Sequence, residues 1–290
     1  MRQLTLAATQ FACTWDIPAN LDKAEVLVRQ AAAQGAKLIL LQELFEAPYF
    51  CIEERPEYFA LAKPFAGNPL IARFADLARE LGVVLPCPYF EKAGPVHFNS
   101  CAMIDADGKI LGHYRKTHIP QGPGYEEKYY FSPGDTGYKV WDTAVGRIGL
   151  AICWDQWFPE CARTMALRGA EVLLYPTAIG SEPPNPGYDS QPHWQACMTG
   201  HAGANIMPVV ASNRIGHEVA PVGRDLTFYG SSFIADPAGQ VVAKASRDTE
   251  QVITATFDMD HIADLRASWG IFRDRRPETY GAIATLDGQG

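Results

Sequence analysis

The segment GRIGLAICWDQWFPE, from Gly146 to Glu160, joins an apolar strand pattern to a tryptophan-rich turn, with Cys153 at the junction. The run before the cysteine predicts a buried strand. Residues Pro159–Ala170 begin with proline and end near a glycine, which predicts a helix. A cysteine at the end of a strand serves either as a small buried apolar residue or as a nucleophile. The segment therefore predicts a strand–turn–helix unit of an α/β protein.

Strand and helix patterns alternate along the rest of the chain. This alternation predicts two sheets covered by helices within one domain. The predicted strands and hairpins lie at residues 3–10, 36–44, 82–90, 99–119, 139–153, 171–178, 207–216, 231–246 and 250–259. The predicted helices lie at residues 20–34, 69–81, 159–170, 193–205 and 260–267, and the segments 120–138 and 180–190 are expected to be loops.

The composition and net charge of the chain limit the kinds of molecule that it is expected to bind. The chain has 290 residues, a 47% hydrophobic share and a net charge of −8, which suits a globular α/β protein with a sizeable core. The acidic balance argues against a broad phosphate-binding face, and we expect no nucleic-acid partner. The one dense basic run, Phe272–Tyr280, is short and interrupted by acidic residues.

The distribution of apolar residues and cysteines indicates the compartment. No stretch approaches the roughly 18 uninterrupted apolar residues of a membrane helix, and the N-terminal segment lacks the pattern of a cleaved signal peptide. The seven cysteines are scattered, odd in number and without a Cys-x-x-Cys pair. These features predict reduced thiols in the cytoplasm and no membrane association.

Three chemically capable residues end strand-like segments, namely Glu43 in LILLQELF, Lys116 in YRKTHIP and Cys153 in GLAICWD. Sites in α/β sheets tend to form beyond the carboxyl ends of strands. A thiolate is a strong nucleophile, a carboxylate can accept its proton, and an ammonium can stabilise an oxyanion. The three together would perform acyl transfer, although each alone is more often a packed or solvated residue.

The same three segments, in this order, resemble the nitrilase superfamily, whose members cleave non-peptide carbon–nitrogen bonds with a Glu-Lys-Cys triad. The resemblance covers nearly the whole chain and implies a four-layer α-β-β-α sandwich. It implies Glu43 as general base, Lys116 as oxyanion stabiliser and Cys153 as nucleophile, helped by the backbone N–H of Trp154. A second glutamate of the family falls at Glu126 or Glu127, and we place it at Glu127. The family usually has proline before the first glutamate, where this chain has glutamine.

Within that superfamily, the segments RKTHIPQGPGYEEKYYF, CWDQWFPECAR and YPTAIGSEP most resemble the branch that hydrolyses the ureido group of N-carbamoylputrescine. The resemblance implies a small substrate with a cationic tail. Glu182 and Asp155 are the candidate carboxylates for that tail. Trp154, Trp157 and Tyr49 are candidate aromatic contacts, although packing is the more common role for Trp157 and Tyr49. N-carbamoyl-β-alanine, another carbamoyl amino acid and a simple aliphatic amide stay open as substrates, with Arg163 and Arg214 as possible carboxylate partners.

A metal site is the alternative to this interpretation. His193, Cys197 and His201 share one face of a predicted helix, but they would span about 12 Å, too far for one ion to reach all three. We therefore expect neither a metal nor a cofactor. A binding protein that keeps this fold without activity is disfavoured by the intact triad residues.

The C-terminal segment has the composition of an interface. From about residue 268 it contains Trp269, Phe272, Arg273 and Tyr280, and aromatic and arginine side chains are enriched at protein interfaces. We expect residues 1–290 to form a single carbon–nitrogen hydrolase domain. This segment is then expected to lie at the interface of a homo-oligomer, a dimer or larger.

Overall fold

The computed structural model describes residues 1–289. Its first group of strands consists of two three-stranded sheets, β14–β1–β2 and β3–β4–β5. Residues 83–85 connect them, because Val84 pairs with Leu38 in parallel and Leu85 N donates a hydrogen bond to Ile104 O. These strands are β1 (Gln3–Gln10), β2 (Leu38–Leu40), β3 (Cys87–Ala93), β4 (Val96–Ile104), β5 (Ile110–Arg115) and β14 (Gln251–Asp258).

The second sheet has six strands in the order β13–β12–β9–β8–β7–β6, and β10 and β11 form a separate hairpin. The strands are β6 (Lys139–Thr143), β7 (Gly146–Leu150), β8 (Val172–Pro176), β9 (Val209–Ser212), β10 (Ile215–Val219), β11 (Asp225–Tyr229), β12 (Phe233–Ala235) and β13 (Val241–Lys244). The α-helices are α1 (Ile17–Ala33), α2 (Pro69–Leu81), α3 (Glu127–Tyr130), α4 (Pro159–Leu167), α5 (Gln191–Asn205) and α6 (Met259–Trp269).

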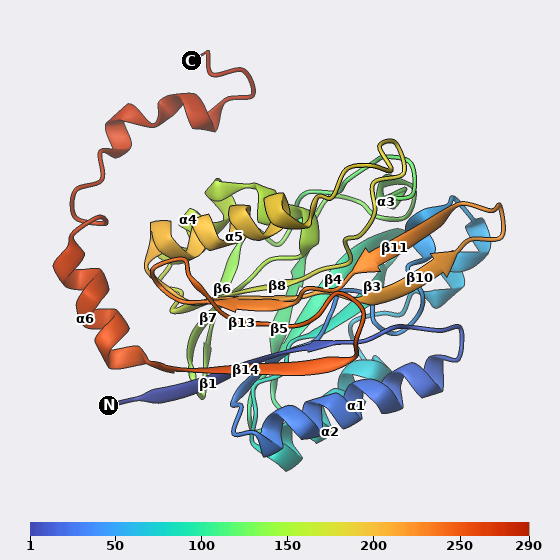
Figure 1. Cartoon of the computed structure of the whole chain (residues 1–290), viewed down its shortest axis with the longest axis horizontal. Coiled ribbons are helices and arrows are strands. Elements are labelled where there is room, and N and C mark those ends of the chain that lie inside the picture. The colour runs from blue at the N-terminus through green and yellow to red at the C-terminus, as the bar shows by residue number, and fades with distance from the viewer. Residues whose placement is uncertain (290) are drawn as a thin grey trace.

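The two sheets pack face to face, and helices cover both outer faces (Figure 1). Helices α1 and α2 lie below the layer that contains β1 and β14, and helices α4 and α5 lie above the layer that contains β6, β7 and β8. One apolar cluster contains side chains of both sheets, among them Leu6, Leu40, Leu150 and Leu174. The prediction of a four-layer α-β-β-α sandwich is therefore confirmed.

Local sequence signals explain why the predicted helix over residues 69–81 matches the structure. The side chain of Asn68 accepts a hydrogen bond from Leu70 N, and Pro69 occupies the first helical position. Gly82 ends α2 with φ 61°, a left-handed conformation that a glycine adopts without steric strain. The apolar face of α2, which includes Phe74, packs on the first group of strands.

Two predicted strands are shorter in the structure. The strand expected over residues 36–44 is regular only at Leu38–Leu40, because the Gln42 side chain bonds to the backbone of Phe11 and Leu44 adopts φ 48°. The strand expected over residues 207–216 breaks between β9 and β10. Both breaks lie next to the candidate site, so they bend the chain where functional side chains project.

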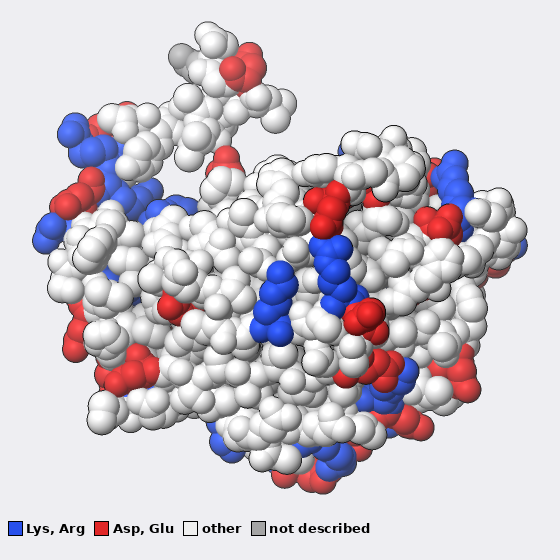
Figure 2. All heavy atoms as spheres, viewed as in Figure 1, with Lys and Arg blue, Asp and Glu red and all other residues white. Residues whose placement is uncertain are grey.

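The C-terminal segment after α6 extends away from the four layers (Figure 1). Exposed apolar side chains lie at the end of α6, at Trp269, and on the segment itself, at Ile283 and Leu286. On the face drawn in Figure 2, charges of both signs are scattered, and the densest positive group lies on this segment. Within residues 1–289, no helix combines the length and the apolar content needed to cross a membrane.

Candidate active site

The fold brings Glu43, Lys116 and Cys153 together from three separate parts of the chain. Glu43 lies in the turn after β2, with its backbone N–H bonded to Thr177 O. Lys116 directly follows β5, and Cys153 begins a short 3₁₀ turn after β7. All three side chains are buried, so each acts in an environment from which water is largely excluded.

The ammonium of Lys116 lies between two carboxylates. Its Nζ is 2.9 Å from Glu43 Oε1 and 2.6 Å from Glu127 Oε2. Burial lowers the pKa of Lys116, but Glu127 and Glu43 outweigh this effect and raise it well above its ordinary value. The side chain therefore stays protonated. Within residues 1–289 these carboxylates are its only hydrogen-bond partners, which leaves the third N–H of the ammonium for a ligand.

Glu43 has one occupied and one open carboxylate oxygen. Oε1 accepts hydrogen bonds from Lys116 and from Asn99 Nδ2, the latter at 2.6 Å. Oε2 is buried and has no partner within residues 1–289. A buried carboxylate oxygen without a donor is costly, and such an atom is a natural proton acceptor in an active site.

Glu127 is the first residue of α3 and is the second carboxylate that contacts the Lys116 ammonium. Its Oε1 accepts a hydrogen bond from the Tyr49 hydroxyl at 2.7 Å. Burial raises the pKa of Glu127 to about 7, with Lys116 acting in the opposite direction and Glu43 adding to the rise. Glu127 therefore exchanges a proton near neutral pH, while its contact with Lys116 favours the ionised form.

Cys153 stands at a strained position of the backbone. Its φ is 44°, a left-handed conformation that costs a residue with a Cβ roughly 1–2 kcal/mol and is common at functional sites. Burial raises the pKa of the Cys153 thiol well above its ordinary value, and Glu43 adds to the rise. The thiol is therefore neutral in the free protein, and a nucleophilic attack by its sulfur would require a base that removes the proton at that step.

Asp155 holds the turn that carries Cys153. Its carboxylate is fully buried and accepts hydrogen bonds from Ile152 N, His118 N and the Tyr114 hydroxyl, at 3.1, 2.9 and 2.7 Å. The side chain does not line the pocket. The prediction that Asp155 contacts the substrate does not fit this placement, because both carboxylate oxygens are occupied within the protein.

We expect Asp155→Asn to lower both stability and turnover. In the variant, the side-chain NH₂ of asparagine would face N–H or O–H groups that donate to a carboxylate oxygen in the wild type. A buried polar group left without a partner costs about 1–3 kcal/mol of folding free energy. The loosened turn would also displace the thiol. Thermal unfolding and kcat measure the two effects, with Asp142→Asn, which removes an exposed charge on β6, as the control. An unchanged kcat would show that Asp155 does not position Cys153.

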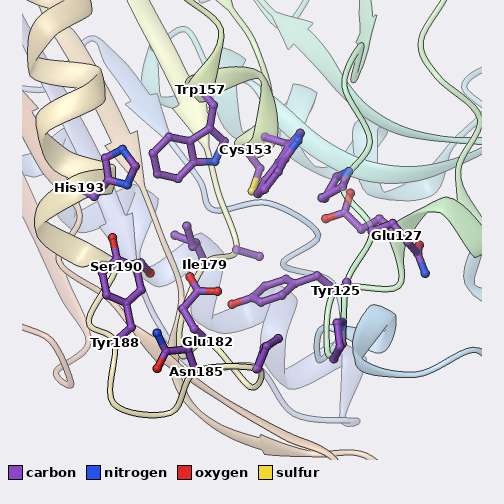
Figure 3. A pocket seen from close by; sticks show the side chains of 17 residues that line it. Tyr125, Glu127, Cys153, Trp157, Ile179, Glu182, Asn185, Tyr188, Ser190 and His193 are labelled. Atoms are coloured by element: carbon purple, nitrogen blue, oxygen red, sulfur yellow. The ribbon is translucent and has the colours of Figure 1, made fainter.

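A cavity of about 520 Å³ opens onto Cys153 and Glu127 (Figure 3). Glu182 points into it from the loop after β8, opposite Cys153. Trp154 and Trp157 pack edge to face at 6.2 Å. The lining consists mainly of aromatic, proline and small side chains: Pro120, Gln121, Gly122, Pro123, Tyr125, Glu127, Cys153, Trp154, Trp157, Ala178, Ile179, Glu182, Pro184, Asn185, Tyr188, Ser190 and His193.

The cavity includes three of the five candidate substrate contacts. Trp154 and Glu182 line it, whereas Tyr49 is fully buried behind Glu127. The prediction of Tyr49 as a substrate contact therefore does not fit its position. Trp157, for which the sequence favoured plain packing, also lines the cavity.

Neither arginine that could have paired with a substrate carboxylate reaches the cavity. The Arg163 guanidinium donates to Ala204 O, and that of Arg214 is buried against backbone carbonyls. Among residues 1–289, no lysine or arginine lines the cavity. The sequence reasoning missed Asn99 and Tyr125. Tyr125 accepts a hydrogen bond from Gly180 N and donates to Ser181 O, which fixes the loop that carries Glu182.

The helix face considered for a metal is occupied by packing contacts. His201 Nε2 and Cys197 Sγ both lie at hydrogen-bond distance from Gln156 O, while His193 packs against Trp157. Within residues 1–289, no group of three or more His, Cys, Asp or Glu side chains is arranged to hold a metal ion.

Comparison with known proteins shows the family of the chain. The profile of the carbon-nitrogen hydrolase family matches residues 5–267. The chain belongs to the carbon-nitrogen hydrolase family. The resemblance of its motifs to the nitrilase superfamily is thereby confirmed, and the protein is a hydrolase of carbon–nitrogen bonds.

Relatives of this carbon-nitrogen hydrolase match it over nearly its full length. An N-carbamoylputrescine amidase of Solanum lycopersicum is 58% identical over 290 residues, covering 99% of this chain and 97% of the relative. A citrullinase of Francisella tularensis subsp. tularensis is 52% identical, covering 98% and 99%. The crystal structure of a carbon-nitrogen hydrolase from Helicobacter pylori G27 superposes with a TM-score of 0.92 at 38% identity, covering 98% and 99%.

Proposed function

We propose that this carbon-nitrogen hydrolase converts N-carbamoylputrescine and water to putrescine, carbon dioxide and ammonia through a thioester on Cys153. The observation that carries the proposal is the composition of the aromatic cavity that opens onto the buried thiol. Its lining includes Glu182, a second carboxylate besides the Lys116-bound Glu127, and among the residues that the structure describes it includes no arginine or lysine. The named relative from Solanum lycopersicum supports the substrate.

In the first step, Glu43 Oε2 takes the proton of the Cys153 thiol while the sulfur attacks the ureido carbon. The electron pair of the carbonyl bond moves onto oxygen, where the third N–H of Lys116 and the Trp154 backbone N–H stabilise it. When the carbon–nitrogen bond breaks, the leaving nitrogen receives the proton from Glu43. Glu127 holds the lysine and compensates its charge.

In the second step, Glu43 takes a proton from water, and the resulting hydroxide attacks the thioester carbon. The carbon–sulfur bond breaks, and the sulfur recovers its proton from Glu43. If ammonia leaves first, the released N-alkyl carbamic acid loses carbon dioxide in solution and yields putrescine. The same residue therefore acts as base and acid in both halves of the reaction.

The charge of the cavity favours a cationic tail. The carboxylate of Glu182 can pair with the terminal ammonium of N-carbamoylputrescine, and the faces of Trp154 and Trp157 can contact its methylene groups. A substrate carboxylate would meet Glu182 without a compensating arginine. This argument disfavours N-carbamoyl-β-alanine and other carbamoyl amino acids.

Citrulline is the second candidate, because a relative that is 52% identical is a citrullinase. Citrulline carries the same ureido group and an ammonium, but also a carboxylate. The absence of lysine and arginine from the cavity lining favours the substrate without that carboxylate.

The test is ammonia release from N-carbamoylputrescine beside citrulline, N-carbamoyl-β-alanine and neutral N-butylurea. We expect the cationic substrate to give the highest kcat/KM. In Glu182→Gln, its kcat/KM should fall about tenfold, the equivalent of ~1.4 kcal/mol, while that of N-butylurea should stay unchanged. Asp189→Asn removes a charge from the same loop outside the cavity and is the control. A preference for either carboxylate substrate would refute the proposal.

We infer that the chain is one catalytic domain in a homo-oligomer, with the segment from about residue 268 at the interface. The exposed Trp269, Ile283 and Leu286 of a segment that extends away from the sandwich support this inference. We also infer a reducing compartment such as the cytoplasm, because all seven cysteines are free.

A further inference from the structure

Behind Glu43 lies a buried arginine that the proposed reaction does not use. Arg214 sits between β9 and β10, and its side chain is 0% exposed. One guanidinium nitrogen donates to Glu43 O at 2.9 Å and to Leu44 O at 3.0 Å, and the other pairs with Glu218 Oε1 at 2.9 Å. The guanidinium thus fastens the turn that projects the Glu43 carboxylate.

Glu218 connects Arg214, through Tyr49, to Glu127. Its Oε2 accepts a hydrogen bond from Tyr49 N at 2.6 Å, and the Tyr49 hydroxyl donates to Glu127 Oε1 at 2.7 Å. Glu127 and Glu43 meet again at the ammonium of Lys116. The contacts therefore form a closed ring. Its members are Glu43, Arg214, Glu218, Tyr49, Glu127 and Lys116.

We propose that Tyr49, Arg214 and Glu218 are positioning residues that set the spacing of the Glu43 and Glu127 carboxylates around the Lys116 ammonium. This inference rests on the proposed reaction, in which both carboxylates act through that lysine. None of the three residues lines the cavity, so they act on the substrate only through the residues they hold.

The energetics of the pair distinguish it from ordinary packing. A buried arginine–glutamate pair loses hydration that costs several kcal/mol per ion, and an apolar pair of similar volume often stabilises a protein as well. Here the Arg214 guanidinium donates hydrogen bonds to the turn that includes Leu44. Leu44 has φ 48°, a conformation that a branched side chain rarely adopts. The Tyr49 ring is fixed by edge-to-face packing on Phe228 at 5.7 Å. Rigid partners of this kind hold catalytic groups in place.

The Tyr49 hydroxyl also affects when Glu127 is ionised. Burial raises the pKa of Glu127 to about 7, whereas Lys116 and the Tyr49 hydroxyl lower it. Loss of the hydroxyl would raise this pKa further, so a smaller fraction of Glu127 would be ionised at pH 6 to 7. The titratable groups that face Glu127 are Lys116, Glu43, Tyr49, Cys51, Tyr125 and Cys153.

The test compares Tyr49→Phe with Tyr130→Phe. Tyr130 lies on α3 in the same apolar cluster and donates a buried hydrogen bond to Glu53 O. Within residues 1–289 its hydroxyl has no hydrogen bond to Lys116, Glu43 or Glu127. In Tyr49→Phe we expect kcat at pH 6.5 to fall about tenfold with KM retained. The acidic limb of the pH profile should move about one pH unit higher. Tyr130→Phe should change thermal stability alone. An unmoved acidic limb in Tyr49→Phe overturns the proposal.

A double-mutant cycle tests whether the ring acts as a unit. Arg214→Lys keeps the charge but loses the planar fork, and we expect kcat to fall about tenfold at constant KM. With Tyr49→Phe, the combined loss should be less than the product of the single losses. A full product would show independent residues and refute the network; if Arg214→Lys does not fold, Glu218→Gln takes its place. Ratios to wild type are measured on whichever substrate wild type hydrolyses best, so a wrong substrate assignment leaves this test intact.

Discussion

Replacing Cys153 by alanine is expected to lower kcat roughly 10⁴- to 10⁶-fold, the range seen when a covalent nucleophile is removed. The reason is structural as well as chemical. The thiol is held at a strained φ of 44°, it lines the cavity, and it lies close enough to Glu43 for that carboxylate to raise its pKa. Without the sulfur, water would have to attack a ureido carbon that resonance makes a poor electrophile.

The measurement is ammonia release, together with mass spectrometry of enzyme quenched during turnover. Wild type should show the added mass of the thioester, and Cys153→Ala should not. Cys197→Ala is the control, because this half-buried thiol on α5 lies against Gln156 O and lines no part of the cavity. If Cys153→Ala keeps more than a tenth of the wild-type kcat, Cys153 is not the nucleophile.

The residues of the site that sequence could predict are those that follow apolar strand patterns. Lys116 directly follows β5, and Cys153 follows β7 by three residues, so the rule that sites form beyond strand ends selected them as candidates. The buried apolar runs of β1, β7 and β8 also predicted the two sheets. These signals are local, since each depends on a few neighbouring residues.

The partners of the buried charges could not be predicted in the same way. Arg214 stands in an apolar run that favoured one continuous strand, yet it contacts Glu43 and Leu44, which lie about 170 positions earlier. Asp155 lies in a turn, where charged side chains are usually exposed, but the Tyr114 hydroxyl of β5 and the His118 backbone N–H donate to its buried carboxylate. Burial of a charge depends on contacts that only the folded chain creates.

The hairpin β10–β11 was missed although a local signal existed. Pro221 and Gly223 between the two strands are typical turn residues. The polar side chains of this segment hid the alternation, because Glu218 faces inward to pair with Arg214. A functional constraint thus broke the pattern from which a strand is ordinarily predicted.

Replacing Lys116 by methionine is expected to have the second large effect, on both activity and stability. Methionine keeps the unbranched length of lysine but removes the charge, which leaves Glu43 and Glu127 buried without a cation. Loss of an oxyanion donor alone costs about 10²–10³ in kcat. Because one of two facing carboxylates then stays protonated, the base is also impaired, and we expect a loss of at least about 10³-fold.

The stability loss should depend on pH in a defined direction. Burial already raises the pKa of Glu127 to about 7, above the value of an unfolded glutamate, and removal of Lys116 raises it further. A carboxyl whose pKa is raised by folding destabilises the folded state. This destabilisation grows as the pH rises above the pKa that the carboxyl has in the unfolded chain. The variant should therefore be near wild type at pH 5 and lose about 3–5 kcal/mol at pH 8.

Chemical unfolding at pH 5 and pH 8 measures this difference, and a second substitution identifies its cause. In Lys116→Met/Glu127→Gln, one uncompensated carboxylate is gone, so stability at pH 8 should recover while activity stays lost. Lys63→Met, which breaks a partly exposed pair with Glu46, should cost less than about 1 kcal/mol and leave kcat unchanged. If Lys116→Met is equally destabilised at both pH values, its effect comes from packing, and the charge balance of the two glutamates does not govern this site.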